Sequence, residues 1–317
     1  MDPDRVIAAV PAGAGAAAMA TGVVSVGLHL AGIEWFSILW LGIGTGIWLA
    51  LLGVFAFRLT DDRTRWIADA DTPAALTAVA ATTVLGTRFA LLGWQPVAIA
   101  ALAAAFVLWV VLNPFVISHW TTPTVGTHFL LCVATQGLAV LGATLAADLH
   151  ARWLTGAALV VFVGGLGCYA AVVARFSFAQ FRAGAGDQWV CAGALAISAL
   201  AAGKLIVATD ASGWDGWPHT AVRVLAVALV AADLSLYAVL AACEVRWPRL
   251  WFDFRRWATA FPLGMSAVAT TTVATALDLP WLRAVGLALI WPAAVLCTIL
   301  LVASVRYLTD ASAATAR

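Results

Sequence analysis

Long apolar runs recur from one end of this chain to the other, and most extend for about eighteen residues or more. A run of that length crosses the hydrocarbon core of a bilayer, which is about 30 Å thick, as a single α-helix. The composition agrees, because 63% of the residues are hydrophobic and 10% are charged. Soluble domains average roughly 45–50% apolar and 25% charged residues. We therefore predict an all-α integral membrane protein.

Charged residues and Pro or Gly breaks divide these runs into ten predicted spans. We place the spans at 8–31, 35–57, 73–92, 97–116, 126–147, 153–175, 188–207, 219–242, 257–277 and 282–307. Tight turns alternate with longer links, except between the seventh and eighth spans. This alternation of short and long connections predicts five helical hairpins that all enter the membrane in the same direction, arranged about an axis along the membrane normal. We expect one domain over 1–310 with a central pore, followed by a short cytoplasmic tail at 311–317.

Basic residues are distributed unevenly between the two sides of the predicted spans. Twelve arginines lie toward the side that carries both termini, and five basic residues lie toward the other side. The positive-inside tendency then places both termini in the cytoplasm. We expect the membrane to be a bacterial-type plasma membrane. The net charge is only +1 and the basic residues are scattered, so we expect no nucleic-acid partner.

The odd-numbered spans differ in composition from the even-numbered ones. The odd spans hold only five aromatic residues, far fewer than the even spans, but they hold sixteen Ser and Thr against seven. Bulky aromatic side chains suit lipid contact, whereas small and hydroxylated side chains pack helices closely or line a narrow polar path. We predict an inner ring of odd spans. For any one helix, simple close packing explains the same composition.

Ionisable residues inside a membrane are costly and are retained mostly for function or pairing. The odd spans lack Asp and Glu, but they contain Arg88 and Lys204 toward their outer ends. Arg223 and Arg283 begin even spans on the same side. A neutral, hydroxylated path with a basic mouth attracts anions. The alternative is that these four side chains only extend to the membrane interface.

One acid, Asp233, lies deep in a span, the eighth. We expect it to pair with Lys204 of the adjoining seventh span. If transport is coupled to protons, Asp233 is instead the candidate protonation site.

The ninth span begins RRWATAFPLGMSAVATTTVATAL. Pro262 removes a backbone hydrogen bond and bends the helix, and Gly264 adds freedom beside it. The ring of Phe261 is placed to project into the axis, where an apolar constriction gates a pore by excluding water. Ordinary core packing is the alternative role for this ring.

Four segments resemble the tellurite-resistance/C4-dicarboxylate transporter family, which includes slow anion channels. The most specific is W-A-T-A-F-P-L-G-M-S-A-V-A-T at 257–270, which is similar to the ninth-helix motif of the family. MATGVVSVG at 19–27, GTHFLLCVATQGLAVLGATLA in the fifth span and QWVCAGALAISALAAG at 188–203 support it. The resemblance covers nearly the whole chain.

The resemblance implies ten helices around a central pore, and usually a homotrimer whose protomers each have their own pore. It places the aromatic residue that occludes the pore at Phe261. The kinking and pore-lining positions that it implies are Pro262, Gly264, Met265, Thr21, Gly22 and Gln136.

The chain departs from the family pattern at Ala20, where a glycine is usual, and at Ser266, where carriers commonly have tyrosine. The anion therefore stays open among a C4-dicarboxylate, sulfite, a halide or nitrate, and a tellurite-related oxyanion. A channel and a proton-coupled carrier also both stay open.

Two other classes of protein compete with transport. An intramembrane redox or metal-dependent enzyme would use histidines, which stand at 29, 119, 128, 150 and 219. They form no i, i+4 pair and lie at different depths, and the five cysteines form no zinc-type spacing. We therefore expect no enzyme activity, cofactor or metal, with small anions and the lipid bilayer as partners. A structural or sensory membrane protein without flux is the other alternative.

Overall fold

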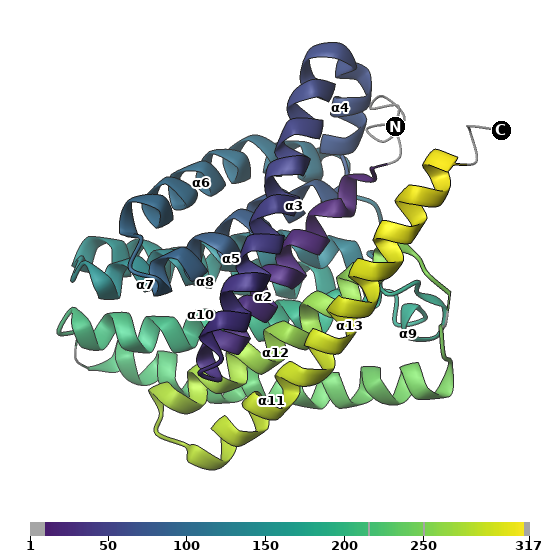
Figure 1. Ribbon diagram of the computed structural model, residues 1–317. Helices are drawn as coiled ribbons and strands as arrows, with labels where there is room; N and C mark the ends of the chain where they lie inside the picture. The colour runs from purple at the N-terminus through teal and green to yellow at the C-terminus, as the bar shows by residue number, and fades with distance from the viewer. Residues whose placement is uncertain (1–9, 215, 250, 314–317) are drawn as a thin grey trace.

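The computed structural model describes residues 10–214, 216–249 and 251–313, and nearly all of this part of the chain is helical (Figure 1). The first described residues, the short helix α4 (Arg63–Ala70) and the end of the last helix lie toward one end of the molecule (Figure 1). We call this the terminal end, and the opposite end the hairpin end. The predicted tail at 311–317 is described only to residue 313, and residues 311–313 belong to the last helix.

Five helices correspond to the odd-numbered spans and are buried along most of their length. They are α2 (Gly15–Leu30), α5 (Thr77–Leu91), α7 (Leu130–Asp148), α10 (Val190–Ala211) and α12 (Trp257–Ala276). A short 3-10 turn precedes each of them at the terminal end: η1 (Ala12–Ala14), η2 (Pro73–Leu76), η3 (Gly126–Phe129), η4 (Asp187–Trp189) and η5 (Phe254–Arg256). We call these five the inner helices.

Five other helices correspond to the even-numbered spans and expose much of their surface. They are α3 (Glu34–Asp61), α6 (Gln95–Ser118), α8 (Arg152–Val173), α11 (Trp217–Arg246) and α13 (Pro280–Ala313). These are the outer helices. Among the described residues, eight helices are long and apolar enough to cross a membrane, and α2 is a shorter apolar helix of 16 residues.

The inner helices contact one another in a closed order. Helix α2 packs on α5, α5 on α7, α7 on α10, α10 on α12, and α12 returns to α2. Each outer helix packs on the inner helix that precedes it in the chain and also contacts the next one, and α13 completes the set by contacting α2. The inner helices therefore enclose a common axis.

Small residues allow the inner helices to approach this closely. A Cβ atom added to Gly137 of α7 would lie 2.3 Å from the hydroxyl oxygen of Thr83 on α5. A Cβ atom added to Gly203 of α10 would lie 3.1 Å from a methyl group of Val273 on α12. The contact at Gly137 leaves no room for a side chain and the one at Gly203 is tighter than ordinary van der Waals contact, so both glycines allow the helices to lie close together.

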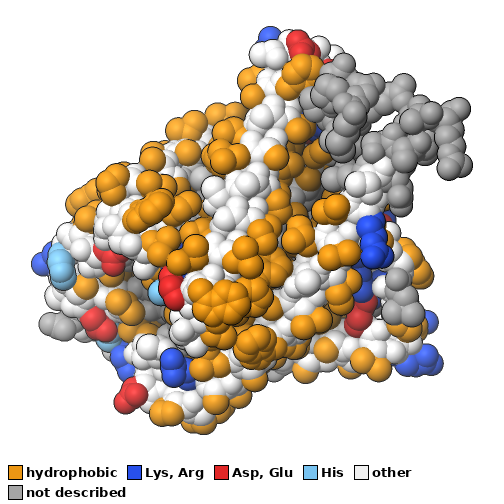
Figure 2. Space-filling model, in the orientation of Figure 1, with side chains coloured by type: hydrophobic (Ala, Val, Ile, Leu, Met, Phe, Trp, Pro, Cys, Tyr) orange, Lys and Arg blue, Asp and Glu red, His pale blue; other side chains and the backbone are white. Residues whose placement is uncertain are grey.

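Tryptophans mark the hairpin end of the molecule. Trp35, Trp153 and Trp281 each stand at the second position of an outer helix, and Trp94 immediately precedes α6. All four are more than half exposed. Indole rings concentrate where a membrane meets water. Figure 2 shows mostly hydrophobic side chains over the exposed face, with charged groups gathered toward its ends.

Candidate functional site

A cavity of about 420 Å³ opens among the starts of the inner helices at the terminal end. Every inner helix contributes to its wall, through Met19, Thr77, Leu130, Val190 and Phe261. We call this cavity the vestibule. Because all five inner helices line it, the vestibule lies on their common axis.

A second cavity continues one to two helical turns deeper on each inner helix. Its wall includes Val26, Thr83, Val140, Leu200 and Met265, again one residue from each inner helix. Its volume is about 20 Å³. This is scarcely more than the roughly 10–15 Å³ that a single water requires. We call it the axial cavity, and its lining is mainly aliphatic.

Phe261 lies at the transition between these two cavities. It is the deepest vestibule residue on α12, and Met265, one turn further on, lines the axial cavity. The side chain is only 1% exposed. A Cβ atom on Gly193 of α10 would lie 3.2 Å from the Phe261 ring and 2.9 Å from the Pro262 ring. Because Gly193 has no side chain, the rings of Phe261 and Pro262 can pack directly against α10.

Two hydrogen bonds fix the start of α12. They therefore also fix the position of the Phe261 ring along the axis of the inner helices. The indole N–H of Trp257 donates to Ser304 of α13 over 3.0 Å. The hydroxyl of Thr259 donates to the carbonyl oxygen of Gly186 over 3.1 Å. Helix α12 is therefore anchored both to an outer helix and to the segment that leads into α10.

The structure places several predicted lining residues away from the axis. The hydroxyl of Thr21 faces α3, where a Cβ atom on Gly44 would lie 2.8 Å from it. Gly22 faces Val84 of α5. Gly264 faces Val23 of α2. A residue on an α-helix is rotated by about 100° from its neighbour, so adjacent positions face different helices.

Gln136 also lies away from the axis. It is fully buried, and its amide nitrogen donates to the carbonyl oxygen of Phe162 on α8 over 3.1 Å. The next residue, Gly137, lines the axial cavity instead. Gln136 therefore joins an inner helix to an outer one.

Lys204 is the predicted basic residue that shares the axial face of its helix. It follows Ile197 by seven residues and Leu200 by four, and both of these line the axial cavity. Residues at this spacing lie on one side of an α-helix. The side chain is half-buried near the hairpin end, within electrostatic range of Asp148.

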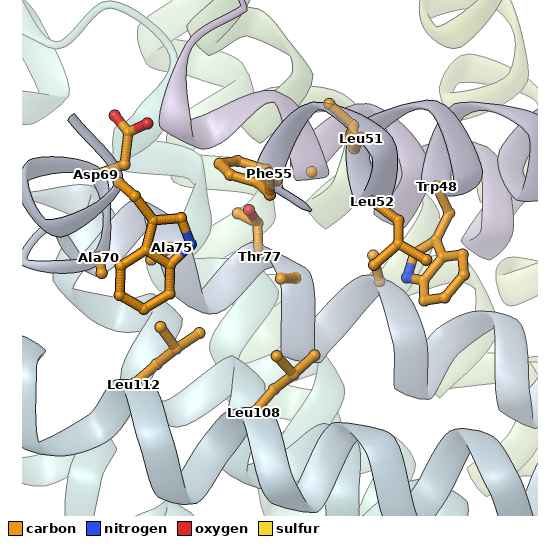
Figure 3. A pocket seen from close by; sticks show the side chains of 14 residues that line it. Trp48, Leu51, Leu52, Phe55, Asp69, Ala70, Ala75, Thr77, Leu108 and Leu112 are labelled. Atoms are coloured by element: carbon orange, nitrogen blue, oxygen red, sulfur yellow. The ribbon is translucent and has the colours of Figure 1, made fainter. Parts of the chain in front are cut away.

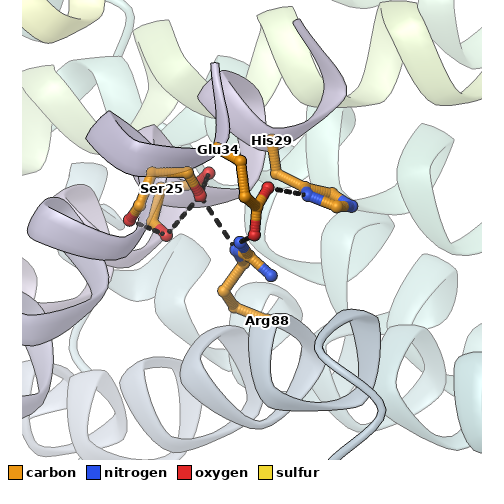
Figure 4. A network of polar contacts seen from close by, with 5 residues as sticks. Ser25, His29, Glu34 and Arg88 are labelled. Atoms are coloured by element: carbon orange, nitrogen blue, oxygen red, sulfur yellow. Dashed lines mark hydrogen bonds and ion pairs between the residues drawn. The ribbon is translucent and has the colours of Figure 1, made fainter. Parts of the chain in front are cut away.

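Arg88 is fully buried but faces α3 rather than the axis (Figure 4). Its guanidinium donates to a carboxylate oxygen of Glu34 and, through Nε, to the hydroxyl of Ser37 over 3.0 Å. His29 Nδ1 lies 2.5 Å from the other carboxylate oxygen of Glu34. The charge of Arg88 is thus balanced within a network that ties α2, α3 and α5 together.

The two remaining predicted basic residues lie on outer helices. Arg223 is half-buried on α11 and Arg283 is exposed on α13. Neither lines the vestibule or the axial cavity. Their distance from the axis follows from their position on helices that face outward.

Asp233 of α11 has a different partner from the one expected. It is fully buried and accepts a hydrogen bond of 3.0 Å from the hydroxyl of Ser266 on α12. Among the described residues it forms no ion pair with Lys204, and its second oxygen accepts no hydrogen bond. The two residues lie at different depths, since Lys204 is near the hairpin end and Asp233 is at mid-helix.

Charged vestibule residues are the part of the site that the sequence pattern missed. Asp187, Asp253 and Arg255 all line the vestibule. Asp187 precedes the predicted start of the seventh span by one residue, so the composition of that span does not reveal this acid. Asp187 begins η4, Asp253 directly precedes η5 and Arg255 belongs to η5. These two turns therefore place the charges in the wall of the vestibule.

A separate apolar groove of about 130 Å³ lies between α3, α4, α5 and α6 (Figure 3). Trp48, Leu52 and Phe55 of α3 form one wall, and Leu108 and Leu112 of α6 form the other. The groove has no contribution from α7, α10 or α12. It is therefore a lateral feature and not part of the axis.

The histidines lie apart from one another and have separate partners. His119 contacts the carbonyl oxygen of Phe115, His150 that of Ala211, and His219 the hydroxyl of Thr209. Within the described ranges, no group of three His, Cys, Asp or Glu side chains is arranged to hold a metal ion.

A family model described as voltage-dependent anion channel matches residues 9–305. The chain belongs to this family. The match covers the inner helices and nearly all of the outer ones, and it confirms the resemblance to the tellurite-resistance/C4-dicarboxylate transporter group. As a member of the voltage-dependent anion channel family, the chain is a membrane protein of the anion channel and transporter type. No curated protein matches the chain.

Proposed function

We propose that small anions cross the membrane along the axis of the inner helices and that Phe261 is the gate. The observation that carries this proposal is the wall of the vestibule and the axial cavity, since each is lined by all five inner helices. The Phe261 ring stands between the two cavities, where an apolar side chain excludes water and ions.

In this proposal, residues 1–310 form one domain of ten transmembrane helices, arranged as five parallel hairpins. The terminal end faces the cytoplasm, because most arginines lie there. The exposed tryptophans then lie at the outer interface of a bacterial-type plasma membrane. Lys204, half-buried on the axial side of α10, attracts anions to the outer mouth.

The narrow axial cavity favours small anions that can shed part of their hydration. Thr83 and Thr87 provide hydroxyl groups in a wall that is otherwise mainly aliphatic, apart from Gly137 and Met265. Chloride, nitrate, sulfite and a C4-dicarboxylate such as malate are the substrate classes to compare, together with a tellurium oxyanion.

Replacing Phe261 with Ala tests the gate. In liposomes that contain the purified protein, we expect F261A to pass at least one of these anions about tenfold faster than the wild type, because the apolar constriction widens. F162A is the matched control. Phe162 is also fully buried, but it lies on α8 away from both cavities, so this variant should keep the wild-type flux. If neither the wild type nor F261A passes any anion of the panel, the proposal is wrong.

A further inference from the structure

The vestibule carries acidic groups, whereas Lys204 lies near the hairpin end on the axial face of α10. Three charged residues line the vestibule, namely Asp187, Asp253 and Arg255. Two carboxylates therefore face one guanidinium in a cavity that leads directly to Phe261. The net charge of this wall depends on which groups neutralise each other.

Asp253 and Arg255 neutralise each other. The Arg255 Nη2 atom lies 2.7 Å from Oδ2 of Asp253, and Nε lies 3.2 Å from both carboxylate oxygens. The backbone N–H of Arg255 also donates to Oδ1 over 2.8 Å. These hydrogen bonds hold the pKa of Asp253 below its usual range and raise the pKa of Arg255, so both groups stay charged near neutral pH.

Asp187 keeps an unbalanced negative charge in the vestibule. It lies within electrostatic range of the His128 ring and of Arg255, whose guanidinium already forms its hydrogen bonds with Asp253. No ion pair of Asp187 occurs in the described part of the chain. The side chain is 6% exposed. Its backbone is fixed, since a Cβ atom on Gly126 would lie 2.0 Å from the Asp187 carbonyl oxygen.

We propose that the Asp187 carboxylate is a specificity-determining group that opposes the entry of anions from the vestibule side. This inference rests on the proposed function. With Lys204 on the axial face of α10 near the hairpin end, the proposed path has opposite charges toward its two ends. Anions therefore enter more readily from the hairpin end, and the current depends on the direction of the driving force.

The physical basis is the field of a fixed charge in a narrow opening. Low-dielectric walls focus that field, so one carboxylate changes the local concentration of anions. Dissolved salt screens it, because the Debye length falls from about 10 Å at 0.1 M to about 3 Å at 1 M ionic strength. A charge effect therefore disappears at high salt, whereas a change in pore shape does not.

The test uses planar bilayers that contain the full chain with F261A, so that the gate is open. In about 0.1 M chloride, we expect the added change D187N to raise about threefold the current that chloride carries when it enters from the vestibule. Asn keeps the shape of Asp and removes the charge. Chloride entry from the hairpin end should change much less, and near 1 M salt the difference should vanish.

Two control variants accompany the test. D187E keeps the charge, so it should not show the low-salt increase that D187N shows. D61N removes an exposed carboxylate at the end of α3, at the terminal end but outside the vestibule, and should also leave the current unchanged.

The outcomes separate this inference from the proposed function. If F261A alone conducts but D187N does not change the vestibule-side current at low salt, the inference is wrong. An increase that persists near 1 M salt also overturns it, because a shape change would then be the cause. If F261A itself passes no anion, the proposed function fails.

Discussion

Arg88 and Asp187 show how strongly the effect of a charge depends on its partners. Both are buried, and both lie near an end of an inner helix. Arg88 is bound to Glu34, so its charge holds helices together (Figure 4). Asp187 lines an open cavity and has no ion pair among the described residues, so its charge acts on whatever enters. Residue type and depth alone do not distinguish these roles.

The Arg88 network predicts a stability effect for Glu34. Changing Glu34 to Gln leaves the buried guanidinium without its counter-charge, which costs about 1–2 kcal/mol of unfolding free energy, because the Glu34 carboxylate is 44% exposed and water screens the pair. We expect a clearly lower Tm of the detergent-solubilised protein, followed by intrinsic tryptophan fluorescence. Arg283, which is exposed, supplies the control, since R283A should leave the Tm almost unchanged. Equal melting of E34Q and the wild type would show that the network contributes little.

At the scale of elements, α11 and α12 are joined by the buried hydrogen bond from Ser266 to Asp233. Ser266 directly follows Met265, which lines the axial cavity, so the carboxyl group contacts the helix that carries the proposed gate. Tyr169, Tyr237 and Cys191 lie within electrostatic range of Asp233, and none of them is a cation. A buried carboxyl group without a cation partner is suited to bind a proton.

Replacement of Asp233 tests proton coupling. If an inward proton gradient accelerates anion uptake in liposomes, we expect D233N to abolish that acceleration, because Asn cannot titrate. Uptake without the gradient should stay within about twofold of the wild type, since Asn still accepts the Ser266 hydrogen bond. The comparison variant S266A removes that hydrogen bond but keeps the carboxyl group, so its proton dependence should remain. A gradient effect that survives in D233N assigns Asp233 a purely structural role.

The sequence predicts the identity of the elements better than the rotation of each helix. The scarcity of aromatic residues marked the inner helices correctly, because a closely packed ring excludes large side chains. Phe261 lines the vestibule and Met265 lines the axial cavity. Thr21 and Gln136 line neither cavity, because Gly44 and Gly165 of neighbouring helices receive their side chains. Such contacts depend on tertiary packing and cannot be deduced from one helix alone.

At the scale of the whole molecule, the exposed surface of the outer helices is mostly apolar (Figure 2). Lipid or another copy of the chain must cover it. We predict the trimer that the family resemblance implies, in which each protomer keeps its own path. Light scattering after size-exclusion chromatography should give a protein mass of about three times 33.0 kDa once detergent is subtracted. A mass of one chain in several mild detergents would exclude a stable trimer.

The contact of α12 and α13 with α2 also constrains how this molecule assembles. The wall between α10 and α2 is supplied by the last hairpin, so the first four hairpins alone form a horseshoe with a lateral gap. The ring of inner helices therefore closes only when α12 and α13 are seated, so neither cavity has a complete wall until the end of the chain has joined the fold.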